Sequence, residues 1–283
     1  MKHTKKLFAV LLSALMLLSC IPFAASAEGE PATPTEPTDW IEIYTYEDLD
    51  DVRYDLTANY KLMNDIDMTE WVKPGGDYDY YGQGWNPIGS KDVYASDAFT
   101  GICDGNGHTI SGMRMNVTKF PSGTGSEVFF GLFAAVSGTV RNLTVAGSIT
   151  VNDSKANYAG GITAFLNETG LIENCTNQVK MSVSGSGFQY VGGIAGRGYG
   201  TVKNCRNMAS VFAYSSAEYS NSAYYWNYCN VAGIVGNGIS DTTELDSSPS
   251  NNYYFLKEHK NIHHHVYNKI ILHYFHIWSI ELF

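Results

Sequence analysis

The stretch "GYGTVKNCRN" (residues 198–207) decides the fold of this chain, because its pattern recurs. The same order of glycine, β-forming residues, Asn and an apolar residue occurs as "GTVRNL" from Gly138 and as "GLIENC" from Gly170. A second phrase, written "YVGGIAGR" at residues 190–197, alternates with the first. Its glycines are separated by 30, 32 and 40 residues: Gly131, Gly161, Gly193 and Gly233. A repeat of this period predicts stacked units that bury their apolar faces against one another.

The repeated unit is predicted to consist of strands. Each half-repeat is short, rich in Val, Ile and Thr, and bounded by glycine, which favours strands over helices. Val202 and Cys205 stand three residues apart, and strict alternation would place them on opposite faces. Both point inward only if the chain bends between them. We therefore predict structural corners with a ladder of stacked amides, because Asn tolerates the left-handed conformation, at Asn142, Asn174 and Asn204.

These phrases, together with "WNPIG" (85–89) and "DGNGHTI" (104–110), resemble the GLUG-motif repeat family of secreted and surface-attached bacterial proteins. The resemblance covers roughly residues 41–238. It implies an all-β fold, a right-handed parallel β-helix, with a short α/β N-terminal cap ahead of it. It also implies one segment of a longer extracellular protein, and some relatives have adhesive or immunoglobulin-cleaving roles. Two departures, Ala134 and Ala164, stand where the family phrase usually closes with glycine.

The first 27 residues predict a secretory signal peptide. Three lysines precede an apolar core from Leu7 to Leu18, and Ala25-Ser26-Ala27 provides a small-residue cleavage site. The alternatives are a buried N-terminal helix and lipid attachment at Cys20. No later apolar run is long enough for a transmembrane helix. The predicted location is therefore secreted and extracellular, free or associated with the cell surface.

Four further segments are predicted: a Pro/Thr-rich linker (28–39), an N-terminal capping region (40–98), the repeats (99–238) and an atypical tail (239–283). In the capping region, Thr45 stands ahead of two acidic residues and predicts the start of a helix. The tail has no glycine and holds six of the eight histidines. We interpret it as a frameshift or truncation of a longer repeat protein. A terminal cap and a metal-binding histidine cluster are the alternatives.

Charge limits the classes of partner. The chain has 28 acidic and 18 basic residues, and three of the basic ones are signal-peptide lysines, so the formal charge falls from −10 to −13 on cleavage. Nucleic acids and anionic membranes attract basic surfaces, so neither is expected as a partner.

Four cysteines remain after cleavage, too few for a disulfide scaffold: Cys103, Cys175, Cys205 and Cys229. The second and third occupy equivalent positions one repeat apart. A disulfide between them is one possibility. Stacked reduced thiols are favoured, because parallel side chains in a ladder give poor disulfide torsions.

His108 is the most tempting candidate for chemistry. Asp104 precedes it across a Gly-Asn-Gly turn, and the two could form an acid/base pair. The favoured interpretation is a turn that aligns two strands, because no nucleophile or second carboxylate accompanies them. Two Asp-x-Asp pairs could ligate calcium, although such pairs are common on solvated surfaces: Asp65 with Asp67, and Asp77 with Asp79. We predict no catalytic residue, metal or cofactor.

Two aromatic loops are the predicted binding elements, since rigid aromatic rings among small polar residues suit recognition surfaces. In "YDYYGQGW" the candidates are Tyr78, Tyr80, Tyr81 and Trp85. In "YSNSAYYWNY", an insertion between repeats, they are Tyr224, Tyr225 and Trp226. The predicted function is a non-catalytic module that binds a glycan or a host surface protein. The alternatives are a structural stalk within a larger surface protein and, less favoured, a β-helix enzyme that degrades polysaccharides. The tyrosines could also serve only to pack along the coil.

Overall fold

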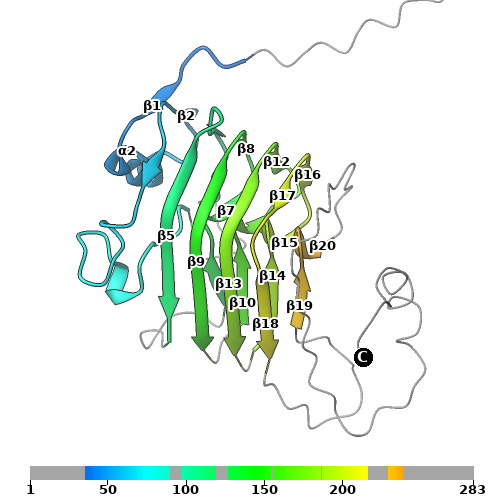
Figure 1. Cartoon of the computed structure of the whole chain (residues 1–283). Helices are drawn as coiled ribbons and strands as arrows, with labels where there is room; N and C mark the ends of the chain where they lie inside the picture. Colours follow the sequence, from blue (N-terminus) through cyan, green and yellow to red (C-terminus); the bar gives the residue numbers. More distant parts are fainter. Residues whose placement is uncertain are drawn as a thin grey trace, which may run out of the picture. The chain divides into compact units, whose positions relative to one another are not determined.

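The computed structural model describes residues 36–89, 97–118, 127–153, 156–185, 187–215 and 229–238. The described residues from Asp39 onward belong to one compact unit, which contains every element described below. The chain is mostly β-strand, as expected (Figure 1). Among the residues that the structure describes, no helix is both long and apolar enough to cross a membrane.

The N-terminal capping region contains the α-helix. Strand β1 (Ile41–Ile43) leads into α2 (Tyr46–Asp51), and the 3-10 turn η1 (Val52–Tyr54) follows. The helix begins where predicted, because Thr45 and Asp48 form a reciprocal capping box. The Thr45 hydroxyl accepts from the Asp48 amide at 3.2 Å, and the Asp48 carboxylate accepts from the Thr45 amide at 2.9 Å. A second 3-10 turn, η2 (Tyr80–Gly82), lies in the first aromatic loop.

The strands form four sheets, and every pairing within them is parallel. The first sheet contains β1, β2 (Tyr60–Leu62), β4 (Ile102–Asp104), β8 (Thr139–Arg141), β12 (Leu171–Glu173) and β16 (Thr201–Lys203). The second contains β3 (Ile66–Asp67), β5 (Thr109–Val117), β9 (Thr144–Asp153), β13 (Thr176–Gly185), β17 (Arg206–Asn207) and β18 (Val211–Ser215). The third contains β6 (Glu127–Phe130), β10 (Ala156–Gly160), β14 (Gln189–Gly192) and β19 (Cys229–Ala232). The fourth contains β7 (Phe133–Val136), β11 (Thr163–Leu166), β15 (Ala195–Gly198) and β20 (Val235–Gly238).

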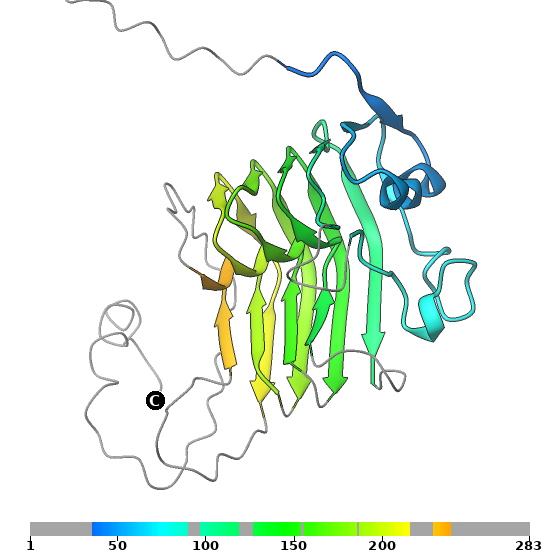
Figure 2. The same cartoon turned by 180° about the vertical axis from the view of Figure 1, so that it is seen from behind.

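From β4 onward the chain visits the four sheets in a constant order, and one such pass is called a coil below. Each strand pairs with its counterpart one coil later, and β5 with β9 shows a register shift between Ile110 and Met113. Val140, Ile172 and Val202 are aligned directly. Successive coils therefore lie side by side from β5 to β19 (Figures 1 and 2). The prediction of short, stacked parallel strands is confirmed.

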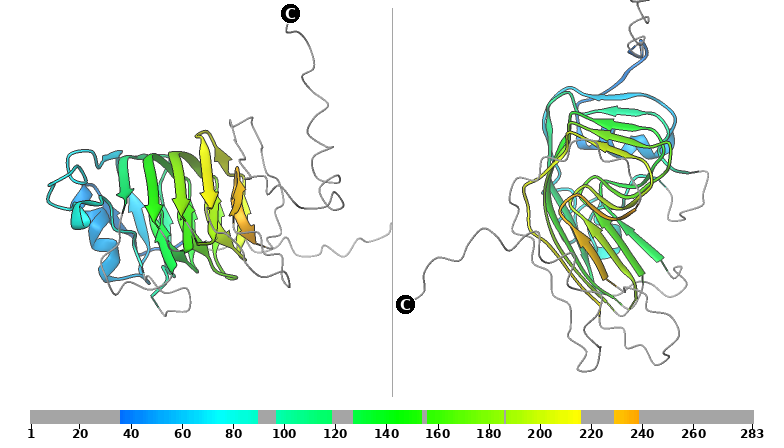
Figure 3. Two further views of the ribbon diagram at one scale, coloured as in Figure 1. Left: turned by 90° about the horizontal axis from the view of Figure 1, so that it is seen from below. Right: turned by 90° about the vertical axis from the view of Figure 1, so that its right-hand side faces the viewer.

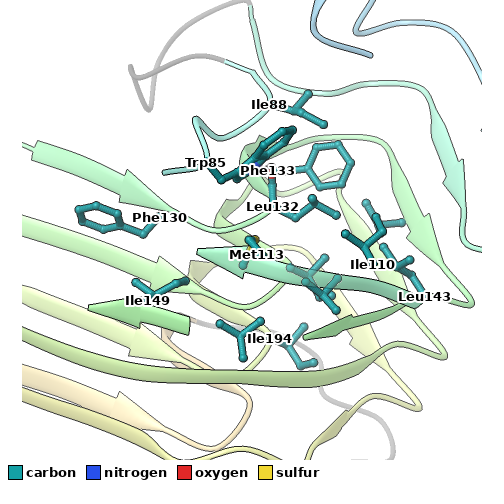
Figure 4. Close-up of a cluster of buried hydrophobic side chains, with 14 of the residues drawn as sticks. Trp85, Ile88, Ile110, Met113, Phe130, Leu132, Phe133, Leu143, Ile149 and Ile194 are labelled. Atoms are coloured by element: carbon teal, nitrogen blue, oxygen red, sulfur yellow. Dashed lines mark hydrogen bonds between the residues drawn. The ribbon is translucent and has the colours of Figure 1, made fainter. Parts of the chain in front are cut away.

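A continuous apolar core fills the space between the sheets (Figure 4). The apolar residue of each "GGI"-type phrase lies in it, and these residues are Leu132, Ile162, Ile194 and Ile234. Burying one such side chain stabilises the fold by about 1.5–3 kcal/mol. Cys103, Cys175 and Cys205 are buried free thiols, and burial raises the pKa of the Cys103 thiol to about 12. The cysteines therefore contribute to the core as small apolar side chains.

The backbone turns at the three asparagines named as corners. Asn142, Asn174 and Asn204 have φ values of 53°, 53° and 51°, in the left-handed region. The Asn174 amide donates to the Asn142 side-chain oxygen at 3.3 Å, and the Asn142 amide donates to Asp104 at 3.0 Å. The first coil turns at Asn106, also at φ 53°. The amide ladder thus continues into a carboxylate at its N-terminal end.

Candidate functional site

A pocket of about 320 Å³ lies beside α2, within the size range of small-molecule sites. Two segments line it, the helix with its following turn and the first aromatic loop. Its lining residues are Tyr46, Asp50, Arg53, Asp77, Tyr78, Asp79, Tyr80, Trp85 and Asn86. The predicted binding loop therefore supplies much of the wall, and α2 supplies the rest.

Stacked rings form a rigid aromatic wall around Tyr46. Its ring lies parallel to Trp71, with centroids 5.2 Å apart and planes at 7°. Tyr78 is tilted against it at 4.7 Å, and Trp85 meets it edge-on at 5.9 Å. Such contacts hold each ring in one orientation. A ligand therefore meets a preformed surface.

The hydroxyl of Tyr46 is buried and has no hydrogen-bond partner among the described residues. The side chain is only 3% exposed. Burial, followed by the charge of Asp50, raises the pKa of Tyr46, so the hydroxyl stays protonated at neutral pH. A buried polar group without a partner costs about 1–3 kcal/mol. The pocket wall thus contains a buried polar group that lacks a partner and that a ligand in the pocket does not reach.

The Arg53 guanidinium joins the two segments of the wall. The Arg53 guanidinium donates to the Asp50 carboxylate through Nε at 3.0 Å and through Nη2 at 2.5 Å. Nη2 also donates to the carbonyl of Asn86 at 3.1 Å, and the guanidinium lies 5.2 Å from the Trp85 ring centroid. These contacts connect α2 to the end of the aromatic loop, so the pocket keeps its shape.

The Asp79 carboxylate holds the first aromatic loop together through hydrogen bonds. Its carboxylate, 4% exposed, accepts from the amides of Gly75 and Gly84 at 2.8 and 2.7 Å. It also pairs with Arg114 at 3.7 Å. A carboxylate engaged in this way holds a turn together. Asp50 and Asp77 therefore remain as the acidic groups of the wall that are not committed to closing this loop.

The predicted aromatic residues differ in where they lie in the structure. Tyr78 and Tyr80 are half-buried in the pocket wall. Trp85 is 2% exposed and its indole donates to the Leu132 carbonyl at 3.1 Å, so it packs into the core and reaches the pocket only with its edge. The side chain of Tyr81 lies outside the described residues, as do Tyr224, Tyr225 and Trp226 of the second loop.

His108 does not pair with Asp104. Its Nδ1 lies 3.2 Å from the carboxylate of Asp65, which also accepts from the Thr109 amide at 2.8 Å. Asp104 instead binds Arg141 at 3.0 Å and the corner amide described above. These contacts agree with the interpretation of this segment as a turn. Within the described ranges, no group of three or more His, Cys, Asp or Glu side chains is arranged to hold a metal ion.

Sequence reasoning missed the helical half of the pocket. Tyr46, Asp50 and Arg53 are four and three residues apart, the spacing that places side chains on one face of a helix. That spacing is a usable signal, because a predicted helix already began at this point.

Comparisons with known proteins give limited matches. No family model matches the chain. A protein of Evansella cellulosilytica named "Putative Gly-rich membrane protein" is 34% identical over 142 residues, which span 48% of this chain and 14% of the relative. A crystal structure described as a "putative immunoglobulin A1 protease" from Bacteroides ovatus aligns with a TM-score of 0.41 and 17% identity, covering 74% of this chain and 64% of that one. The match therefore spans about a seventh of the length of the Gly-rich relative.

Proposed function

We propose that the chain is an exported, right-handed parallel β-helix module that binds a neutral glycan in the pocket beside α2. The constant order of the four parallel sheets supports the β-helix. The lysine-rich leader with its small-residue cleavage site supports export. The resemblance to GLUG repeats and the name of the Gly-rich membrane protein support a location at the cell surface.

The polar and aromatic lining of the pocket carries the proposal. A sugar ring combines apolar C–H faces, which pack on aromatic rings, with hydroxyl groups that both donate and accept. The half-buried rings of Tyr78 and Tyr80 offer the first kind of contact. Asp50 and Asp77 offer acceptors for the second. The acidic groups favour a neutral sugar over an acidic one.

The test is a glycan-binding screen of the mature chain (residues 28–283), followed by titration of the bound neutral glycan with variants. Tyr78→Ala removes one ring of the wall, so we expect binding that is weaker by about tenfold. Tyr46→Phe removes only a hydroxyl that is sealed from the pocket, so we expect unchanged glycan affinity and no loss of stability. Tyr54→Ala is the matched control, because Tyr54 is 80% exposed and does not line the pocket.

A second hydroxyl control is available at Tyr60, which donates to the Asp55 carbonyl at 2.7 Å. Tyr60→Phe should lower stability and leave glycan affinity unchanged. If the wild-type chain binds no neutral glycan, or if Tyr78→Ala binds as well as the wild type, the glycan proposal is wrong and a stalk becomes the better interpretation. Release of new reducing ends during the titration would point to an enzyme instead.

A further inference from the structure

The third and fourth sheets meet at an inward-bent angle (Figure 3, right), and residues mainly of these two sheets form a second, largely buried aromatic cluster. Phe129, Tyr158 and Tyr190 occupy equivalent positions of β6, β10 and β14. Their rings stack with centroids 5.0 Å apart at both steps. Phe165 of the facing sheet meets Tyr158 edge-on at 6.4 Å. These residues form a cluster separate from the main core, and Ala134 and Ala164 lie within it.

Arg197 stands at the end of this ladder. It occupies the position in β15 that Phe165 occupies in β11. Its guanidinium lies 5.4 Å from the ring centroid of Tyr190 and 5.3 Å from that of Tyr199. One Nη2 hydrogen bond goes to the Tyr199 hydroxyl. The cation is thus held between two tyrosine rings on the outer face of the coil.

The hydrogen-bonding capacity of this guanidinium is only partly used. Its Nε–H is buried and has no acceptor. Within the described part of the chain, Arg197 forms no ion pair. The Glu127 carboxylate accepts from the Tyr158 hydroxyl at 2.9 Å rather than from Arg197. Because Nε is sealed from solvent, an anion from outside meets the Nη end of this half-buried side chain, which the two rings hold in place.

We propose that Arg197 binds a carboxylate carried on a sugar ring, so that the module has a second site for an acidic glycan residue. A guanidinium binds carboxylates through two parallel hydrogen bonds. The flanking rings of Tyr190 and Tyr199 offer flat apolar area to the sugar that carries the carboxylate; Tyr199 is 37% exposed and forms the rim. This ligand class differs from that of the acidic pocket beside α2, and the two sites use different residues.

The experiment is calorimetric titration of the mature chain with trigalacturonic acid, its methyl ester, 3′-sialyllactose and a triglutamate peptide. Binding of either acidic sugar without binding of the ester is the expected result. Comparing trigalacturonic acid with 3′-sialyllactose shows whether the site prefers a uronic acid or a sialic acid. Arg197→Gln should weaken binding about 10- to 100-fold, the range for a hydrogen-bonded charged group. Arg197→Lys keeps the charge but loses the planar guanidinium. Its affinity for the acidic sugar should therefore lie between the affinities of the wild type and Arg197→Gln.

Lys203→Gln is the matched control, because it removes one exposed positive charge from the same repeat on a different sheet. It should leave acidic-sugar affinity within about twofold, since exposed charges act weakly. Thermal unfolding checks that each variant is folded; if Arg197→Gln is not, Tyr199→Ala tests the clamp by removing one ring, and several-fold weaker binding is expected. The proposal is overturned if the wild type binds no acidic sugar or binds triglutamate equally well. It is also overturned if Lys203→Gln loses as much as Arg197→Gln. Tyr78→Ala should not change this affinity, which separates the two sites.

Discussion

The side-chain amide of Asn177 donates to the side-chain oxygen of Asn207 at 2.7 Å inside the core, one coil further along the chain. Each Asn also binds the backbone two residues ahead: the Asn177 oxygen accepts from the Val179 amide at 2.9 Å, and the Asn207 oxygen accepts from the Ala209 amide at 3.2 Å. Both buried amides are therefore paired, and the pair fixes the register between β13 and β17.

Breaking this pair should destabilise the fold. Asn177→Ala leaves the Asn207 side chain and the Val179 amide with fewer partners in a buried place, so we expect a loss of about 1–3 kcal/mol in the free energy of unfolding. Urea denaturation measures it. Asn152→Ala, at an exposed position of β9, is the control and should change stability by less than about 0.5 kcal/mol. Equal effects of the two changes would contradict a special role for the pair.

The second glycine of the Gly-Gly-Ile phrase packs closely against the same Asn pair. A Cβ on Gly193 would lie 2.0 Å from the Gly233 carbonyl oxygen and 2.5 Å from Cγ of Asn207. Gly193→Ala should therefore cost more than about 3 kcal/mol, as steric conflicts in a packed core do. Gly75→Ala is a useful comparison, because its Cβ would meet nothing within 4 Å and only its φ of 75° is unfavourable. It should cost about 1–2 kcal/mol, measured by the same denaturation.

The corner residues predict an order of stability among the wild type and two variants. Asn174 has a φ of 53° and donates to Asn142 at 3.3 Å. Asn174→Gly keeps the left-handed backbone but loses the hydrogen bond, whereas Asn174→Ala loses both. We expect the midpoint of thermal unfolding to fall from wild type to Gly to Ala, with Ala costing about 1–2 kcal/mol for the backbone alone. An alanine variant as stable as the glycine variant would show that the backbone strain is unimportant.

Acid should weaken the helix that carries half of the pocket. The Tyr44 amide, together with the Thr45 amide and hydroxyl, lowers the pKa of Asp48. A carboxylate whose folded pKa lies below its unfolded value of 3.8 adds stability above that pH, and the contribution is lost as the pH falls through the folded pKa. Thermal unfolding of Asp48→Asn from pH 6 to pH 2.5 should show a smaller acid-induced decrease than the wild type.

The control for this helix is Asp51→Asn, since Asp51 lies on the same helix and makes no capping bond. Its acid-induced decrease should match that of the wild type. If Asp48→Asn and the wild type lose stability in parallel at every pH, the capping box does not contribute in the way the structure indicates.

Several features of this protein are local enough to be determined by the sequence alone. The left-handed corners follow from the i, i+3 spacing of apolar residues around Asn, and the helix start follows from the capping box at Thr45. The parallel pairing follows from repeats about thirty residues long, because each strand meets its own copy. The corners and the helix start depend on backbone preferences that act within one repeat. The parallel pairing depends on the periodicity of the sequence.

Only the tertiary structure decided the sites. The burial of Trp85 depends on Leu132, the pocket depends on α2 meeting a loop some thirty residues later, and the clamp on Arg197 depends on rings from two sheets. The hydrogen bond of 2.8 Å between the buried side chains of Asn157 and Gln189 was likewise not predictable from the sequence. A linear pattern gives the composition of each segment but not the distance between side chains on different strands. That distance is set by how the coils bend and stack, so the chemistry of the molecule emerges at the contacts between segments.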